Sequence, residues 1–411
     1  MNIFRPADIL LPNGADLEKW AVIACDQFTS DPEYWCRVRR FAGEDPSVIH
    51  MILPEAELES HGPESINVIN ANMDRYLNES LFREYPGSYI YVERTLENGM
   101  IRPGLVGMVD LEAYDYRPGS VSPVRATERT VLERIPPRKM VRKDASLEFP
   151  HVLMLCDDDE FRLIEPIGTI KDSLPKIYDF DLMEDGGHIT GWLVTGEHAA
   201  AFDAIFAAYS ADYHEKYADL EGESVLLAVG DGNHSLATAK SCYEDLKTAN
   251  PGVDLSAHPA RFALVELENI HDPSLVFEPI HRILSEVDRE KLLRDIQTVC
   301  APDGHKVQCV LADQVIELSL DRTRGELAVA VLQEFLDRWL VENPGKIDYI
   351  HGEDEIARLA AAEDAVGFLL PPMEKHSLFR GVIADGVLPR KTFSMGHARE
   401  KRYYLEGRKI K

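Results

Sequence analysis

The stretch that decides the fold is Val225-Leu-Leu-Ala-Val-Gly-Asp231-Gly232-Asn233-His234-Ser235-Leu-Ala-Thr-Ala-Lys240. Its first five residues are apolar and rich in Val and Leu, which predicts a buried β-strand. The strand ends at Gly230-Asp-Gly232, and an amphipathic helical pattern begins directly afterwards. A tight glycine turn into a helix leaves the first amide N–H groups of the helix without partners, and the helix dipole favours an anion there. The sequence therefore predicts an α/β protein with an anion-binding turn.

The residues of this turn have two interpretations. Asp231 and His234 flank it and can hold a metal, move a proton or orient a phosphate. Phosphate contacts would come from the turn itself, through Gly230, Gly232, Asn233 and Ser235. In the alternative interpretation, Asn233 or Ser235 is an N-cap and Asp231 an ordinary turn residue. Because strand–glycine–helix turns are common in α/β folds, the residues alone leave both open.

Further segments, in a fixed order along the chain, resemble a large bacterial and archaeal family catalogued as domain of unknown function 1015. They include Arg125-Ala-Thr-Glu128-Arg129, Ile135-Pro-Pro-Arg138 and Glu148-Phe-Pro-His151, followed by segments at 178–183, 231–235, 272–282, 367–372 and 389–396. The order of these segments, more than any one of them, indicates the family.

The hallmark of that family is a strand, the motif Asp-Gly-His-His-Arg and a helix. The motif is similar to the phosphate-binding turn of the ParB/sulfiredoxin superfamily, which includes free-serine kinases that use a nucleotide as phosphate donor. The resemblance implies a mixed sheet with a ParB/sulfiredoxin-like strand–turn–helix core. This chain has Asn233 in place of a His and Ser235 in place of the Arg. The missing Arg removes a bidentate phosphate ligand, so another cation must substitute. The candidates are Arg125, Arg129, His281, Arg282 and Lys391.

Composition limits the function classes. The chain has 411 residues, 45% hydrophobic and 28% charged, as expected of a globular protein long enough for two or three domains. No apolar run approaches the ~20 residues that span a bilayer, and the N-terminus lacks a signal-peptide profile. Six cysteines without framework spacing favour a reducing cytoplasm. The net charge of −27 argues against a nucleic-acid partner.

Positive charge is nevertheless concentrated in two places. Residues 125–143 carry seven Arg or Lys against two Glu, and residues 386–411 carry eight against two. We call these the basic island and the basic tail. Either could supply a polyphosphate pocket, or could be a charged surface that balances acidic neighbours. Within the tail, Arg390-Lys391-Thr392 is the more suggestive part.

Hydrophobic periodicity predicts two regions: a motif-bearing α/β domain over 1–286 and a smaller C-terminal α+β region over 287–411 that includes the basic tail. It also predicts a helix over 63–85, a helix over 288–299 and a hairpin that turns at 312–313. The acidic run 157–160 is interpreted as a solvated turn, with a divalent-cation site as the alternative. The P-loop, the protein-kinase motifs, the Gly-x-Ser-x-Gly elbow and zinc-binding patterns are absent.

These observations favour an enzyme that transfers a phosphoryl group from ATP or ADP, with Mg²⁺, to a small hydroxylated metabolite, with free L-serine as one candidate. Asp231 would bind the metal or accept a proton, His234 would contact phosphate, and Glu128 is a candidate base or an ion-pair partner. Alternatives are a non-catalytic nucleotide or phosphometabolite sensor and a Mg²⁺-dependent nucleotide or phosphoester hydrolase. The expected partners are therefore small molecules, and a homo-oligomer stays open.

Overall fold

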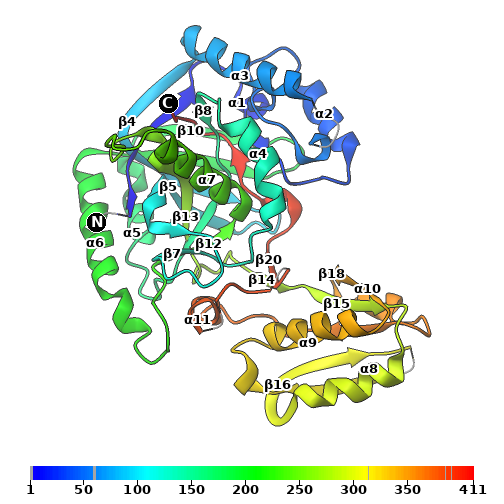
Figure 1. Ribbon diagram of the computed structural model, residues 1–411. Helices are drawn as coiled ribbons and strands as arrows, with labels where there is room; N and C mark the ends of the chain where they lie inside the picture. The colour runs from blue at the N-terminus through cyan, green and yellow to red at the C-terminus, as the bar shows by residue number, and fades with distance from the viewer. Residues whose placement is uncertain (1–2, 59–61, 313, 385, 390) are drawn as a thin grey trace.

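The computed structural model describes residues 3–58, 62–312, 314–384, 386–389 and 391–411 (Figure 1). It has the mixed α/β architecture expected from the sequence: a large body built on one sheet, and a smaller lobe with its own sheet. The helices of the body are α1 (Leu17–Trp20), α2 (Pro32–Ala42), α3 (Pro63–Asn78), α4 (Ile135–Arg142), α5 (Glu165–Ile170), α6 (Gly196–Lys216), α7 (Asn233–Ala249) and α11 (Ser377–Ala384).

The sheet of the body has eleven strands in the order β10-β11-β4-β5-β13-β9-β12-β7-β6, with β1 added on β5 and β2 on β4. Its strands are β1 (Phe4–Arg5), β2 (Ala7–Pro12), β4 (Phe82–Thr95), β5 (Ile101–Asp110), β6 (Tyr114–Asp115), β7 (Val124–Ala126), β9 (Leu153–Cys156), β10 (Lys176–Asp181), β11 (His188–Val194), β12 (Leu227–Asp231) and β13 (Phe262–Asn269). The motif strand β12 is parallel to β7 and antiparallel to β9, so the sheet is mixed at the site.

Both faces of this sheet are buried, as the alternation along β4 shows. Tyr89 and Tyr91 pack in one core with the aromatic side chains of α6, whereas Ile90 and Val92 pack in the other with α2 and α3. Successive residues of a strand point to opposite faces, so an almost continuous apolar run is what a strand covered on both sides requires.

The smaller lobe contains a five-stranded sheet in the order β17-β16-β19-β15-β18. Its strands are β15 (His281–Ser285), β16 (Cys300–Val310), β17 (Val315–Leu320), β18 (Lys346–Ile350) and β19 (Val366–Leu369), and its helices are α8 (Arg289–Asp295), α9 (Ala328–Glu342) and α10 (Glu353–Leu359). Helices α8 and α9 contribute to one core and α10 to another, on opposite faces of the lobe (Figure 1). The expected hairpin is present as β16 and β17, although Asp313 of its turn lies outside the described residues.

The predicted division at residue 286 needs correction at both ends. It separates β15 from the lobe sheet, in which β15 pairs with β18 and β19. It also assigns the basic tail to the lobe, whereas the chain returns to the body after the lobe (Figure 1). Three short strands make this return: β20 (Phe393–Met395) pairs with β14 (Phe277–Pro279), β21 (Tyr403–Tyr404) with β3 (Val22–Ile23), and β22 (Arg408–Lys409) with β8 (Leu147–Glu148). Pairing between distant segments leaves no periodic signal, so composition could not reveal it.

Two predicted helix boundaries also differ. Helix α3 ends at Asn78 because strand β4 begins at Phe82, and the predicted helix 288–299 is α8 followed by a 3₁₀ segment, Ile296–Val299. Among the described helices, none combines the length and apolar character that a bilayer span requires.

Candidate functional site

The turn between β12 and α7 has the glycine conformation and the uncapped helix end expected from the sequence. Gly232 adopts a left-handed conformation with φ of 82°, and a Cβ added there would lie 3.0 Å from Cα of Val152. Glycine is therefore required both for the backbone conformation and for the close approach of β9. No side chain caps α7, and Leu236 provides the first described backbone bond back to Gly232. The amides of Asn233, His234 and Ser235 thus point outward from the helix end, where the dipole favours an anion.

Asn233 adds a buried polar atom to this turn. Its Oδ1 atom is buried and has no hydrogen-bond partner among the described residues. A buried polar atom without a partner costs free energy, and native structures retain few of them. The N-cap interpretation of Asn233 is not supported, because its side chain caps no amide of α7.

Asp231 occupies the last position of β12. Its Oδ1 accepts the amide hydrogen of Gly232 at 2.8 Å, and Nζ of Lys401 lies 3.4 Å from its Oδ2. Burial alone would raise the pKa of this carboxyl, but the ammonium of Lys401, followed by the imidazole of nearby His151, holds the pKa below its ordinary value. Asp231 is therefore ionised at neutral pH and already faces one cation.

The segment 127–131 crosses the carboxyl end of β12. Thr127 donates its hydroxyl to the carbonyl of Val229 at 2.7 Å, and the amide of Val131 donates to Nε2 of His234 at 3.2 Å. Burial, followed by the charges of Arg138 and Arg134, lowers the pKa of His234 to about 4. A neutral His234 accepts a backbone hydrogen bond through Nε2, so its ring fixes this crossing segment.

Glu128 lies in the same crossing segment, close enough to Asp231 for their charges to interact. Its Oε1 accepts the amide hydrogen of Thr392 at 3.3 Å. Burial raises its pKa above the ordinary value, against the opposing effect of Lys391, and the negative Asp231 adds to the rise. A half-buried carboxyl with a raised pKa is suited to hold or transfer a proton.

The cations expected to replace the family Arg separate into two groups. Arg129 and Lys391 have exposed side chains, the first in the crossing segment and the second beside Glu128, and neither side chain has a hydrogen bond or ion pair within the part of the chain that the structure describes. Both remain available to an anion.

The other three candidates, Arg125, His281 and Arg282, have structural roles that correct the expectation. Arg125 turns away from the motif and donates to the carbonyls of Ser122, Glu223 and Ser224, beyond the amino end of β12. His281 is buried in the lobe, where Nδ1 accepts the amide hydrogen of Leu370 at 3.1 Å. Arg282 is 0% exposed and donates to Gln333 and to the carbonyls of Ile280 and Lys391. A cation that satisfies buried carbonyls is not available to a phosphate.

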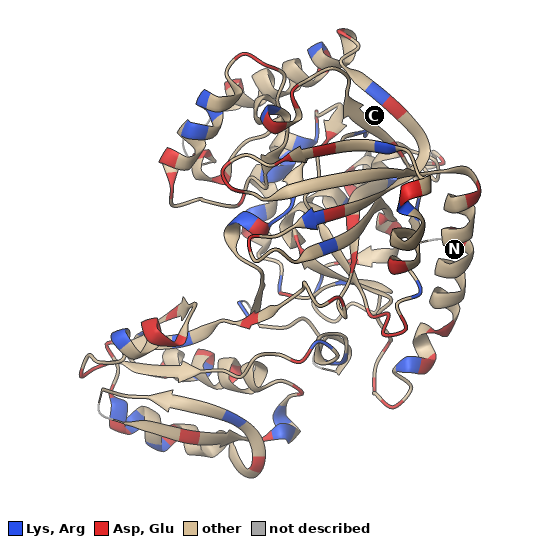
Figure 2. Ribbon diagram, turned by 180° about the vertical axis from the view of Figure 1, so that it is seen from behind, with Lys and Arg blue, Asp and Glu red and all other residues tan. Residues whose placement is uncertain are grey.

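Most charges of the basic island and the basic tail hold the fold together. In the island, Arg138 pairs with Glu55, Lys139 with Asp245 and Arg142 with Glu148. In the tail, the pairs are Arg399 with Asp185, Arg402 with Glu266 and Glu406, Arg408 with Glu148, and Lys409 with Glu84. Figure 2 shows blue and red segments next to each other along the strands of the large sheet. Arg390 lies outside the described residues.

A cavity of about 160 Å³ lies beside the turn. Its walls come from α4, from Ser235 to Ala239 of α7, and from the segments around Cys25, Met51 and His151. Burial raises the pKa of the Cys25 thiol to about 12, so this cysteine is an inert thiol at neutral pH. Sequence patterns did not identify His151, Asp26 or Lys401 as site residues. Of these three residues, only His151 belongs to a segment, 148–151, that carries the family resemblance.

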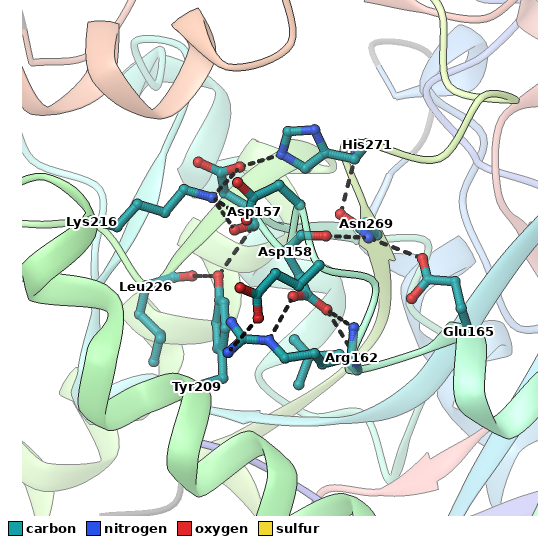
Figure 3. A network of polar contacts seen from close by, with 12 residues as sticks. Asp157, Asp158, Arg162, Glu165, Tyr209, Lys216, Leu226, Asn269 and His271 are labelled. Carbon is teal, nitrogen blue, oxygen red and sulfur yellow. Dashed lines mark hydrogen bonds and ion pairs between the residues drawn. The ribbon is translucent and has the colours of Figure 1, made fainter.

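The acidic run 157–160 lies at the carboxyl end of β9, which is antiparallel to β12 and therefore points away from the motif turn. Figure 3 shows its contacts: Asp157 meets His271 and Lys216, and Asp158 accepts the amides of Arg162 and Leu163. Asp157 and Asp158 are buried and satisfied, so the solvated-turn interpretation is wrong for these two. In the described part of the chain, no three His, Cys, Asp or Glu side chains are grouped to hold a metal by themselves.

The chain matches one family model and several solved structures. A family model described as "Protein of unknown function (DUF1015)" matches residues 5–359. Among solved structures, SbnI with C-terminal truncation from Staphylococcus aureus is 10% identical over 71% of this chain and 83% of that chain, with a TM-score of 0.36. A free serine kinase in complex with AMP is 9% identical over 74% and 91%, with a TM-score of 0.38. A conserved hypothetical protein from Pyrococcus furiosus is 9% identical over 72% and 92%, with a TM-score of 0.35. A search of curated proteins found no match.

Proposed function

The chain belongs to the family described as protein of unknown function DUF1015, and we propose that it binds a nucleotide at the β12–α7 turn and transfers a phosphoryl group to a small hydroxylated metabolite. One observation supports this proposal: groups that favour an anion and groups that favour a cation lie together at this turn. The outward amides of Asn233, His234 and Ser235 suit an anion, and the carboxylates of Asp231 and Glu128 lie beside them. Carboxylates next to a phosphate site repel the anion unless a cation accompanies it.

Mg²⁺ fits this arrangement, because a nucleotide-bound Mg²⁺ needs only one or two protein carboxylates in addition to phosphate oxygens and water. Asp231 and Glu128 are the residues that would hold it. When bound, the metal neutralises charge on the phosphates.

The protein side chains supply the remaining functions. The amides of residues 233–235 bind phosphate oxygens, and the neutral ring of His234 keeps the crossing segment 127–131 in place. Arg129 and Lys391 are the cations that substitute for the family Arg at position 235. Phosphoryl transfer requires mainly positioning and charge neutralisation, so no covalent nucleophile is needed. The six free cysteines are compatible with a cytoplasmic location, which we retain as part of the proposal.

Acceptor-dependent turnover tests this proposal. The full chain is incubated with ATP or ADP and Mg²⁺, with and without a panel of small alcohols and amino acids that includes L-serine, and the phosphorylated products are followed by ³¹P NMR. We expect nucleotide consumption that depends on a hydroxylated acceptor. Consumption without any acceptor would favour a hydrolase, whereas binding without consumption under all conditions would favour a sensor.

A further inference from the structure

We infer that Asp26 and His151 form the binding site for the acceptor hydroxyl, and that Asp26 receives its proton. This assignment rests on the proposed phosphoryl transfer and adds the position of the second substrate. It starts from two polar atoms, Oδ1 of Asp26 and Nε2 of His151, that are buried and without a hydrogen-bond partner in the part of the chain that the structure describes.

The two atoms face each other at 3.6 Å, which is too long for a direct hydrogen bond. His151 is only 3% exposed, and its ring lies edge-on to Tyr404 with 5.3 Å between centroids. The Asp26 side chain is 33% exposed and lies within ion-pair distance of His151, yet neither of the two buried atoms has a hydrogen bond, which is costly. A hydroxyl group can satisfy both atoms at once, because it donates one hydrogen bond and accepts another.

The fold brings this pair to the phosphate turn from two directions. In the β9–β12 ladder, Asp231 is opposite Leu153, and Val152 is the backbone against which Gly232 packs. His151 therefore lies across from the start of α7, close enough to Asp231 to influence the pKa of that carboxyl. Asp26 lies in the turn that follows β3, and β3 pairs with β21. The amide of Ala24 donates to the carbonyl of Arg402, next to Lys401.

The adjacent cavity has the size of a small acceptor. Its volume of about 160 Å³ is close to that of a ~150 Å³ protein cavity that accommodates benzene, which is far smaller than a nucleotide. His151 and Ser235 both line it, so it extends from His151, the partner of Asp26, to the first turn of α7. Its walls also contain the ion pairs of Arg138 with Glu55 and of Arg142 with Glu148. Walls with both charges suit a zwitterion that has a short hydroxylated side chain.

Phosphoryl transfer to the acceptor hydroxyl needs no reactant besides the nucleotide and the acceptor. The acceptor oxygen forms a bond to the terminal phosphorus of the nucleotide while the bond from that phosphorus to the bridging oxygen breaks. The hydroxyl proton passes to the carboxylate of Asp26, and the shortened nucleotide leaves with the electron pair of the broken bond. His151 orients the hydroxyl through its ring nitrogen, so it is a group that contacts substrate as well.

Calorimetry with L-serine and L-alanine tests this site, because the two compounds differ only in the hydroxyl. In the presence of Mg²⁺ and a non-hydrolysable ATP analogue, we expect the full chain to bind L-serine at least about 10-fold more tightly than L-alanine. Asp26→Asn and, independently, His151→Gln should remove this preference. Asp26→Asn should also reduce turnover by about 100-fold or more while affinity for the ATP analogue stays within about 2-fold. Glu33→Gln, on the exposed side of α2, removes a carboxylate from the same N-terminal segment and serves as the matched control.

The outcomes separate this inference from the proposed function. If the parental protein transfers phosphate and Asp26→Asn, folded by its melting temperature, keeps parental turnover, the assignment of Asp26 and His151 is wrong and the proposed function stands. Equal binding of L-serine and L-alanine by a parental protein that binds the ATP analogue overturns the hydroxyl site in the same way. If no nucleotide binds the parental protein, the proposed function fails and this assignment fails with it.

Discussion

Lys401 and Asp231 form an ion pair, with Nζ 3.4 Å from Oδ2, that ties the end of the chain to the motif turn. The ammonium also donates to the carbonyl of Met395 at 3.0 Å. The pair keeps Asp231 ionised next to the helix end where we propose that phosphates bind. In the proposed site, Asp231 would hold a metal ion and Lys401 would face a phosphate, so the tail would supply a cation to the site as well as a contact to the fold.

Lys401→Gln tests this relationship. Because Lys401 lowers the pKa of Asp231, its removal should raise that pKa, which ¹³C NMR of the carboxyl can follow. The depressed pKa stabilises the folded protein above the ordinary value of 3.8, and this contribution is lost as the pH falls through the folded pKa. At pH 7 we expect Lys401→Gln to lower the free energy of unfolding by more than about 1 kcal/mol. Lys409→Gln, which breaks an exposed pair with Glu84, should cost less than that.

Asp231→Asn is expected to abolish chemistry while it preserves the fold. The substitution is nearly isosteric and keeps an oxygen that can accept the amide of Gly232. If Asp231 holds a metal or transfers a proton, turnover should fall by about 100-fold or more. If the variant keeps parental turnover, Asp231 has no role in chemistry and serves only as a turn residue.

Arg129→Ala and Arg125→Ala form a matched pair from one short segment. Arg129 is exposed beside the turn, so its loss should weaken nucleotide affinity by about 1.5–3 kcal/mol with the melting temperature unchanged. Arg125 is buried on three carbonyls, so its loss should lower the melting temperature and leave nucleotide affinity of the folded protein unchanged. Parental nucleotide affinity in Arg129→Ala would leave Lys391 as the substitute cation.

His234 predicts a dependence of stability on pH. Its pKa is about 4 in the folded protein and 6.5 in an ordinary histidine, so the unfolded chain takes up a proton first as the pH falls. The stability that neutral His234 contributes is present above pH 6.5 and is lost progressively as the pH falls toward about 4. The free energy of unfolding in urea should therefore decrease less between pH 7 and pH 5 for His234→Gln than for the parental protein. Equal decreases would show that the His234 pKa is not depressed.

Local sequence patterns predicted the secondary-structure elements and the turn that depend on neighbouring residues. The run 225–229 and the Gly230-Asp-Gly232 break correctly placed β12, the turn and α7, because burial and turn chemistry act over a few residues. The end of α3 was missed because the competing strand β4 begins only four residues later and favours pairing with β2 and β5. Long-range strand pairing therefore outweighs local helical propensity in this segment.

Contacts between segments that are distant in the chain could not be predicted from the sequence. Charge clustering did identify the island and the tail, but it could not distinguish Arg129, which is exposed, from Arg125, which binds carbonyls. Asp26, His151 and Lys401 reach the site through β3, β9 and β21, and no motif spacing connects them. The assignment of the tail to the smaller lobe failed for the same reason.

Calorimetric titration of the full chain is the most direct test of nucleotide phosphate binding at the β12–α7 turn. ATP is titrated with and without Mg²⁺, and adenosine serves as the control that has the base and sugar but no phosphate. We expect ATP to bind, more tightly with Mg²⁺ than without, and adenosine to bind at least about 100-fold more weakly, because charged hydrogen bonds to the phosphates supply most of the affinity. Absence of binding for ATP and ADP, or binding of adenosine as tightly as ATP, would contradict the claim.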